Sequence, residues 1–276
     1  MGWYDEFERS PECCYCVICD KYSYFSYDHI NKREFMTELS IKTKLPLGIA
    51  WIWVKSSFAI FREKPINFMF FGLSFVIFSM LPFMGTFFAT LVIIRMLLSA
   101  NDIVENRDIK LELNFKTMFS QRNVISYAFF CVGYDLIAMS IISHLMSSWG
   151  IDGATPATLM DHRVVYLIMS MSLFKTLFFG ISLAFVTFNP TLTVLRSLLL
   201  SWSFIFKNIA VVALGLFLLL PFLLIPLYLM IMITLSMTNP ILFGLSFLVL
   251  VVLILLFLVI TTLFSFKLYQ DGVSHE

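Results

Sequence analysis

The chain has 276 residues, of which 59% are hydrophobic and only 13% are charged, and its mean hydropathy is +0.89. Soluble domains average about 45–50% apolar and about 25% charged residues, so this composition excludes an ordinary soluble domain and indicates a membrane protein. The net charge of +1 provides no basic surface large enough to bind nucleic acid.

The first 35 residues differ from the rest, because they contain four of the five cysteines. Their two overlapping C-x-x-C pairs are typical of zinc or redox sites, but four thiolates within seven residues can hardly all reach one tetrahedral ion. Since Met36 resembles an ordinary start, residues 1–35 are interpreted as a disordered tail or a false-start extension. Residues 36–65 are expected to form a cytoplasmic amphipathic segment. The weak metal-ligand candidates are Cys13, Cys14, Cys16 and Cys19.

Three apolar pairs of segments follow, and each pair is expected to form a helical hairpin. About 20 apolar residues cross the roughly 30 Å hydrocarbon core as a helix. Breaks with turn chemistry lie at Leu81–Gly85, at Ser147–His162 and at Thr238-Asn239-Pro240. The predicted fold is therefore all-α. The six predicted spans are 66–82, 83–99, 123–147, 163–188, 209–237 and 240–266, with a cytoplasmic C-terminus at 273–276.

The distribution of cations decides whether residues 66–98 cross once or twice. With six crossings and a cytoplasmic N-terminus, 17 of the 19 Lys and Arg residues lie on the inner side. A single crossing there would place the cations from Arg107 to Arg122 on the opposite side from the N-terminus. The positive-inside rule therefore predicts six crossings with both termini in the cytoplasm.

Each hairpin is preceded by a similar segment, at residues 58–65, 115–123 and 202–208. An aromatic pair followed by a cation is typical of an amphipathic helix lying at the membrane surface. The alternative is that any cytoplasmic membrane boundary collects aromatic and basic residues. Membrane lipids are the expected partners, together with other membrane proteins or a second copy of the chain. The inner-interface anchors are predicted to be Arg95, Trp51, Trp53, Trp202 and Lys207.

Several short motifs resemble those of an uncharacterised family of six-helix proteobacterial inner-membrane proteins. That family is distantly similar to the membrane domains attached to some glycerophosphodiester phosphodiesterases. The resemblance covers about residues 40–272 and implies the fold and compartment but no catalytic residue. Its motifs are Trp51-Ile-Trp53, Phe61-Arg-Glu-Lys-Pro65, Leu81-Pro82-Phe83-Met84-Gly85, Asn189-Pro190 and Phe266-Lys-Leu-Tyr269-Gln-Asp271.

Two charged residues, Asp135 and Lys175, are predicted at the middle of the membrane. They lie at equal distances from the loop that joins the third and fourth spans, so they are expected to meet at the same depth. A lone charge at the bilayer centre is unfavourable by about 2.5–3.5 kcal/mol on insertion scales, which favours mutual pairing. The pair is either a functional centre, such as a proton relay or a contact for a solute, or a structural pair that aligns two helices.

Three classes of function are compatible with these features. A non-enzymatic scaffold or membrane-assembly factor needs only the helices and is the first interpretation. A transporter or transporter subunit would use Asp135 and Lys175, and a water-reachable cavity around them would favour it. A lipid-active enzyme is the third, although no nucleotide loop, nucleophile elbow or zinc-protease motif is present, and catalysis and cofactors are not expected.

Overall fold

The computed structural model describes residues 39–81, 84–107, 118, 119, 121–150, 162–189, 191–236 and 240–275. In these ranges the protein forms eight α-helices and one two-stranded sheet, so the all-α prediction is confirmed. The elements are β1 (Leu39–Ile41), α1 (Gly48–Glu63), α2 (Pro65–Ser79), α3 (Gly85–Val104), α5 (Arg122–Ser148), α7 (His162–Phe188), α8 (Val194–Lys207), α9 (Ile209–Ser236), α10 (Pro240–Gly272) and β2 (Val273–His275).

The helix ends occur at residues with suitable local chemistry. Pro65 and Pro240 begin α2 and α10, where the missing N–H removes no intrahelical bond. The Thr193 hydroxyl caps α8 by accepting a hydrogen bond from the Arg196 amide at 3.3 Å. Gly150 follows α5 with a φ of +70°, a conformation common just beyond a helix end. Helices therefore occupy all six intervals predicted from the apolar pattern.

Membrane-spanning capacity is shown for fewer than six helices. Among the described residues, α3, α5 and residues 248–272 of α10 are long and apolar enough to cross a membrane. The consecutive helices α8 and α9 add a fourth candidate if they are taken as one bent span. The shorter helix α2 has 15 residues, or about 22 Å, against a hydrocarbon core of roughly 30 Å. Six crossings are thus not confirmed.

Helix α8 lies almost at a right angle to the first part of α9, with a bend of 88° between them. Amphipathic helices therefore precede two of the three hairpins, α1 before α2–α3 and α8 before α9–α10. Most of the third such segment, residues 115–123, lies outside the described residues. One face of α8 exposes apolar side chains at helical spacing, which suits a helix lying on a membrane surface. These side chains are Leu195, Leu199, Trp202 and Phe206.

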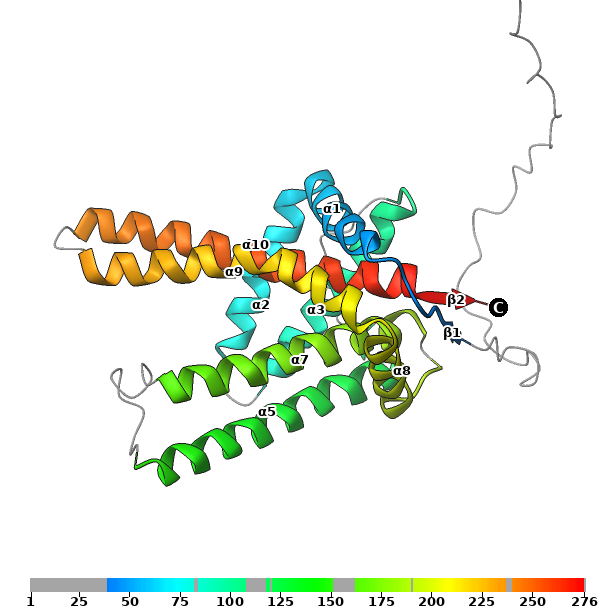
Figure 1. Ribbon diagram of the computed structural model, residues 1–276, viewed down its shortest axis with the longest axis horizontal. Helices are drawn as coiled ribbons and strands as arrows, with labels where there is room; N and C mark the ends of the chain where they lie inside the picture. The colour runs from blue at the N-terminus through cyan, green and yellow to red at the C-terminus, as the bar shows by residue number, and fades with distance from the viewer. Residues whose placement is uncertain are drawn as a thin grey trace, which may run out of the picture. The chain divides into compact units, whose positions relative to one another are not determined.

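Helix α10 is the central element of the bundle and packs against α1, α2, α3, α7 and α9. Its partner α9 runs alongside it, and the α5–α7 hairpin lies on the other side of α2 in the view of Figure 1. Small residues allow close approach: Gly72 of α2 lies against Val259, and Gly180 of α7 lies against Ser265. The end of the bundle where α5 begins and where α7 and α10 end is called the α8 end below.

The two strands join the two ends of the described chain. Leu39, Ser40 and Ile41 pair antiparallel with His275, Ser274 and Val273. Nearby, the Trp53 indole donates a hydrogen bond of 2.9 Å to Asp271 Oδ2. The segments before α1 and after α10 therefore lie on the same side of the helical bundle.

Candidate functional site

Asp135 and Lys175 each lie at the midpoint of a long helix. Asp135 is 13 residues from both ends of α5, and Lys175 is 13 residues from both ends of α7. At 1.5 Å per residue, both are about 20 Å from the ends of their helices. If these helices cross the membrane, the two charges lie near its centre.

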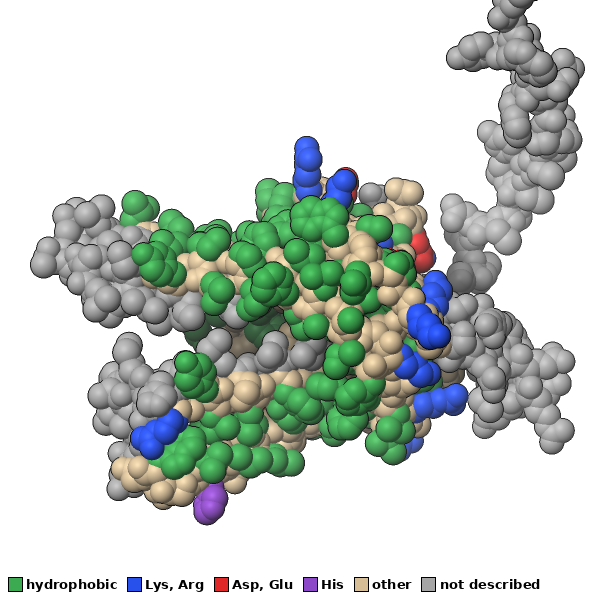
Figure 2. Space-filling view, in the orientation of Figure 1, with side chains coloured by type: hydrophobic (Ala, Val, Ile, Leu, Met, Phe, Trp, Pro, Cys, Tyr) green, Lys and Arg blue, Asp and Glu red, His purple; other side chains and the backbone are tan. Residues whose placement is uncertain are grey.

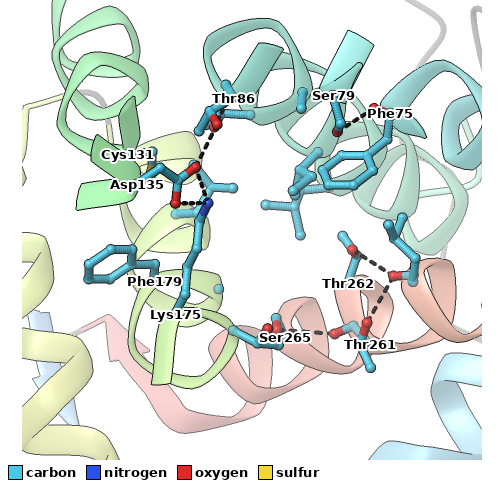
Figure 3. A pocket seen from close by; sticks show the side chains of 18 of the residues that line it. Phe75, Ser79, Thr86, Cys131, Asp135, Lys175, Phe179, Thr261, Thr262 and Ser265 are labelled. Carbon is cyan, nitrogen blue, oxygen red and sulfur yellow. Dashed lines mark hydrogen bonds and ion pairs between the residues drawn. The ribbon is translucent and has the colours of Figure 1, made fainter. Parts of the chain in front are cut away.

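The structure brings the two side chains together (Figure 3). Lys175 Nζ donates hydrogen bonds to Asp135 Oδ1 at 2.6 Å and to Oδ2 at 2.7 Å. The Thr86 hydroxyl, in the first turn of α3, donates a third bond to Oδ2 at 2.5 Å. The carboxylate is therefore held by two other helices, and Lys175 retains one N–H that these bonds do not use.

This triad, defined as Thr86, Asp135 and Lys175, borders a cavity of about 490 Å³. The side chains of Lys175 and Asp135 are 33% and 31% exposed, so the ion pair is not sealed in the core. Helices α2, α3, α5, α7 and α10 all contribute to the cavity wall. The pair thus lies in a space large enough for water or a small molecule.

Five of the hydroxyl residues that line the cavity each donate their own proton to a carbonyl one turn earlier in the same helix. This arrangement leaves oxygen lone pairs available as acceptors. Thr261 and Thr262 stand across the cavity from the ion pair (Figure 3). The five residues are Ser79, Thr90, Thr261, Thr262 and Ser265.

Part of the cavity wall is buried in the bundle. This part includes the side chains of Leu97, Tyr127 and Leu183. The Tyr127 hydroxyl donates to the Phe179 carbonyl at 2.8 Å and also contacts Ser182. Three other lining residues, Ser79, Thr176 and Ile254, are exposed, so the cavity reaches the surface of the bundle at these positions.

The expected interface residues differ in their surroundings. Trp51 is 59% exposed, and Trp202 is 40% exposed beside Phe178. Trp53 is fully buried and bonded to Asp271, so it attaches α1 to α10 and does not face lipid as expected. Lys207 ends α8 with an exposed side chain. Arg95 is largely buried and forms an ion pair with Asp102 at 3.9 Å.

Metal-ligating clusters are absent from the part of the chain that the structure describes. The four N-terminal cysteines lie outside the described residues, and the fifth, Cys131, is a buried free thiol on the cavity wall. The donors at the cavity are hydroxyls with one carboxylate and one ammonium, a set better suited to a polar organic solute or water than to a transition metal.

Thr86 and the α10 hydroxyls are site residues that the sequence interpretation did not include. The sequence contains a signal for the second group, because Thr261, Thr262 and Ser265 follow a long run of aliphatic and aromatic residues. No comparable signal marks Thr86. Its hydrogen bond to Asp135 depends on the level along α5 at which α3 begins, and this level is set by the packing of the helices.

No family model, curated protein or solved structure matches the chain. The family resemblance described from the sequence therefore stays a prediction. Over its described residues, the structure supports an all-α protein with three to four helices capable of spanning a membrane.

Proposed function

We propose that the protein is an integral membrane protein that binds a small polar solute at the Asp135–Lys175 pair and moves it across the membrane. The observation that carries this proposal is the 490 Å³ cavity, into which a partly exposed ion pair faces at mid-length of two apolar helices. Because both side chains are partly exposed beside this cavity, water or a polar solute can reach the charges, which also lowers the desolvation penalty of the pair.

The proposed orientation is that of a bacterial inner-membrane protein with both ends in the cytoplasm. Lys and Arg side chains gather mainly near the α8 end of the visible face, while apolar side chains cover the lengths of the helices (Figure 2). This one-sided distribution agrees with the positive-inside pattern and favours the α8 end as the cytoplasmic side.

Cysteine labelling tests whether water reaches the cavity. In a background with the five native cysteines replaced, Thr261→Cys is treated with a cationic, membrane-impermeant methanethiosulfonate reagent in lipid nanodiscs. Thr261 lines the cavity, so we expect rapid labelling. Leu248→Cys on the same helix is the matched control, because Leu248 is 62% exposed on the surface and would face lipid. Equal protection of both thiols would contradict a solvated cavity.

Small probes of matched size test which charge the site accepts. Thermal unfolding of the detergent-purified protein is measured with glycine, ethylammonium or acetate, which are a zwitterion, a cation and an anion. A ligand that binds only the folded state raises the unfolding temperature in proportion to RT ln(1 + [L]/Kd). We expect at least one probe to stabilise the native protein but not the Asp135→Asn/Lys175→Gln variant. Stabilisation by none of them would count against a small polar solute.

A non-enzymatic scaffold is the second candidate function. The observation that favours it is the exposed apolar stripe of α8, defined as Leu195, Leu199, Trp202 and Phe206, which could contact lipid or another membrane protein. A dry cavity in the labelling experiment would leave this second candidate as the better interpretation.

A further inference from the structure

We propose that α2 and α3 form a re-entrant hairpin that enters the membrane from the α8 end, turns at its centre and returns to the same side. The hairpin would not cross the membrane, so the crossings would be α5, α7, α9 and α10. This inference rests on the assignment of the protein to a membrane but not on the binding of a solute.

The depth of the turn is shown by contacts with α5. The Thr86 hydroxyl, one residue after the start of α3, bonds to Asp135 at the midpoint of α5. One residue later, the Phe87 ring lies 4.9 Å from the ring of Phe129, nearer the beginning of α5. Helix α3 thus begins at mid-length of α5 and runs toward the α8 end.

The position of the first charge in α3 agrees with a start at the membrane centre. Helix α3 is long enough to cross a membrane, but its first ten residues, Gly85 to Ile94, rise only about 15 Å before Arg95, which is half of the roughly 30 Å hydrocarbon core. Arg95 forms an ion pair with Asp102, one of the polar residues near the end of α3. Helix α2, at 15 residues, is too short for an upright crossing.

The chemistry of the turn agrees with a position inside the membrane. Residues 80–85 contain no polar side chain, whereas the other two hairpin connections contain Asp152 and Asp161, or Thr238 and Asn239. Four of the described side chains exposed around the turn are apolar, and Met80 is 77% exposed, whereas the exposed Ser79 hydroxyl is bonded to the Phe75 carbonyl. A surface of this kind is favourable against acyl chains and unfavourable in water. The exposed apolar residues at the turn are Ile77, Met80, Leu81 and Met84.

Three described backbone amides at the turn are bonded within the hairpin, as a position without bulk water requires. The amides of Met80 and Leu81 donate to the carbonyls of Ile77 and Phe78, and the Gly85 amide donates to Leu81. Gly85 permits the tight reversal, because a Cβ there would lie 2.9 Å from the Phe78 and Ser79 carbonyl oxygens.

The positive-inside pattern is equally compatible with two crossings and with none. Both arrangements return the chain to the side from which α2 starts, so the cations after α3 stay on the side of the N-terminus. A re-entrant hairpin, however, fills only the half of the bundle nearer the α8 end. The solute cavity would then open toward the opposite half, where the α2–α3 hairpin is absent.

Nitroxide depth measurements distinguish the two arrangements. A spin label is attached at Met80→Cys in the cysteine-free background, in phospholipid bilayers, and its depth is obtained from the ratio of collisions with oxygen and a water-soluble nickel chelate. Two reference positions are equally exposed: Ile137→Cys near the midpoint of α5, and Tyr166→Cys about nine residues from the midpoint of α7. Tyr166 lies about 14 Å from that midpoint.

We expect the Met80 label to give the depth of the Ile137 label. A depth equal to or shallower than that of the Tyr166 label would overturn the re-entrant hairpin and establish two crossings. Ile77→Cys, also exposed, is labelled in parallel in case the Met80 variant does not fold. The result does not depend on solute binding, because a dry cavity would leave the depth of the turn unchanged.

Discussion

Asp135 accepts hydrogen bonds from side chains of two other helices, Thr86 of α3 and Lys175 of α7. The number of bonded partners distinguishes the Asp135 carboxylate from the Lys175 ammonium. Removing the charge of Asp135 affects bonds to α3 and α7, whereas the Lys175 ammonium donates both of its described hydrogen bonds to Asp135. The carboxylate is therefore the member of the pair whose loss changes more of the structure.

We expect Asp135→Asn to lower the free energy of unfolding by about 2 kcal/mol, because it leaves the Lys175 ammonium without a counter-charge in an apolar region. The exchanged pair Asp135→Lys/Lys175→Asp should recover part of this loss. Recovery is incomplete because the displaced carboxylate no longer meets the Thr86 hydroxyl. Unfolding in mixed detergent micelles measures the difference, and equal stability of the single and exchanged variants would show that the pair contributes no net attraction.

The contact between Asp135 and Lys175 could be anticipated from the sequence, because two charges placed symmetrically about a hairpin connection have the same depth. Thr86 could not, since a threonine near a turn is common and its partner is set by the depth of α3. Trp53 was expected to face lipid with Trp51, but helix periodicity turns neighbouring tryptophans to different sides, and Trp53 is buried against α10.

At the scale of elements, the α2–α3 hairpin is stabilised by the absence of a side chain at Gly85. We expect Gly85→Ala to destabilise the protein by about 1–3 kcal/mol, because the added methyl would push against two carbonyl oxygens. Gly133→Ala in α5 is the control, since a Cβ there meets nothing within 4 Å. Its unfolding temperature should be unchanged or slightly raised. Similar behaviour of both variants would contradict a tight hairpin.

Helix positions were predictable because apolar runs and Pro, Gly or Asn breaks have local causes. Prolines at 65 and 240 begin helices as expected from their missing N–H. The depth to which a helix pair enters the membrane has no such local signal. The distribution of Lys and Arg indicates only the side of the membrane to which the chain returns. The sequence therefore predicts two crossings for residues 66–99, which stays a prediction, and the contact between Thr86 and Asp135 is the basis for proposing a turn at the membrane centre.

At the scale of the whole molecule, pairing of β1 with β2 requires an even number of crossings between them. We expect reporters fused before Leu39 and after Glu276 to report the same side of the membrane, and a reporter inserted at residue 155 to report the other side. Alkaline phosphatase and green fluorescent protein fusions measure this in a bacterial host. Opposite sides for the two ends would contradict the strand pairing.

The three residues of the triad are synthesised one after another, separated by several tens of residues. Thr86 is made 49 residues before Asp135, and Lys175 follows Asp135 by 40 residues. At about 5–20 residues per second, α5 waits some seconds for its counter-charge during synthesis. The hydroxyl on the already completed hairpin is the partner available in that interval, and the ammonium completes the site only when α7 joins. The order of synthesis therefore makes the neutral hydrogen-bond partner of the carboxylate available before the charged one.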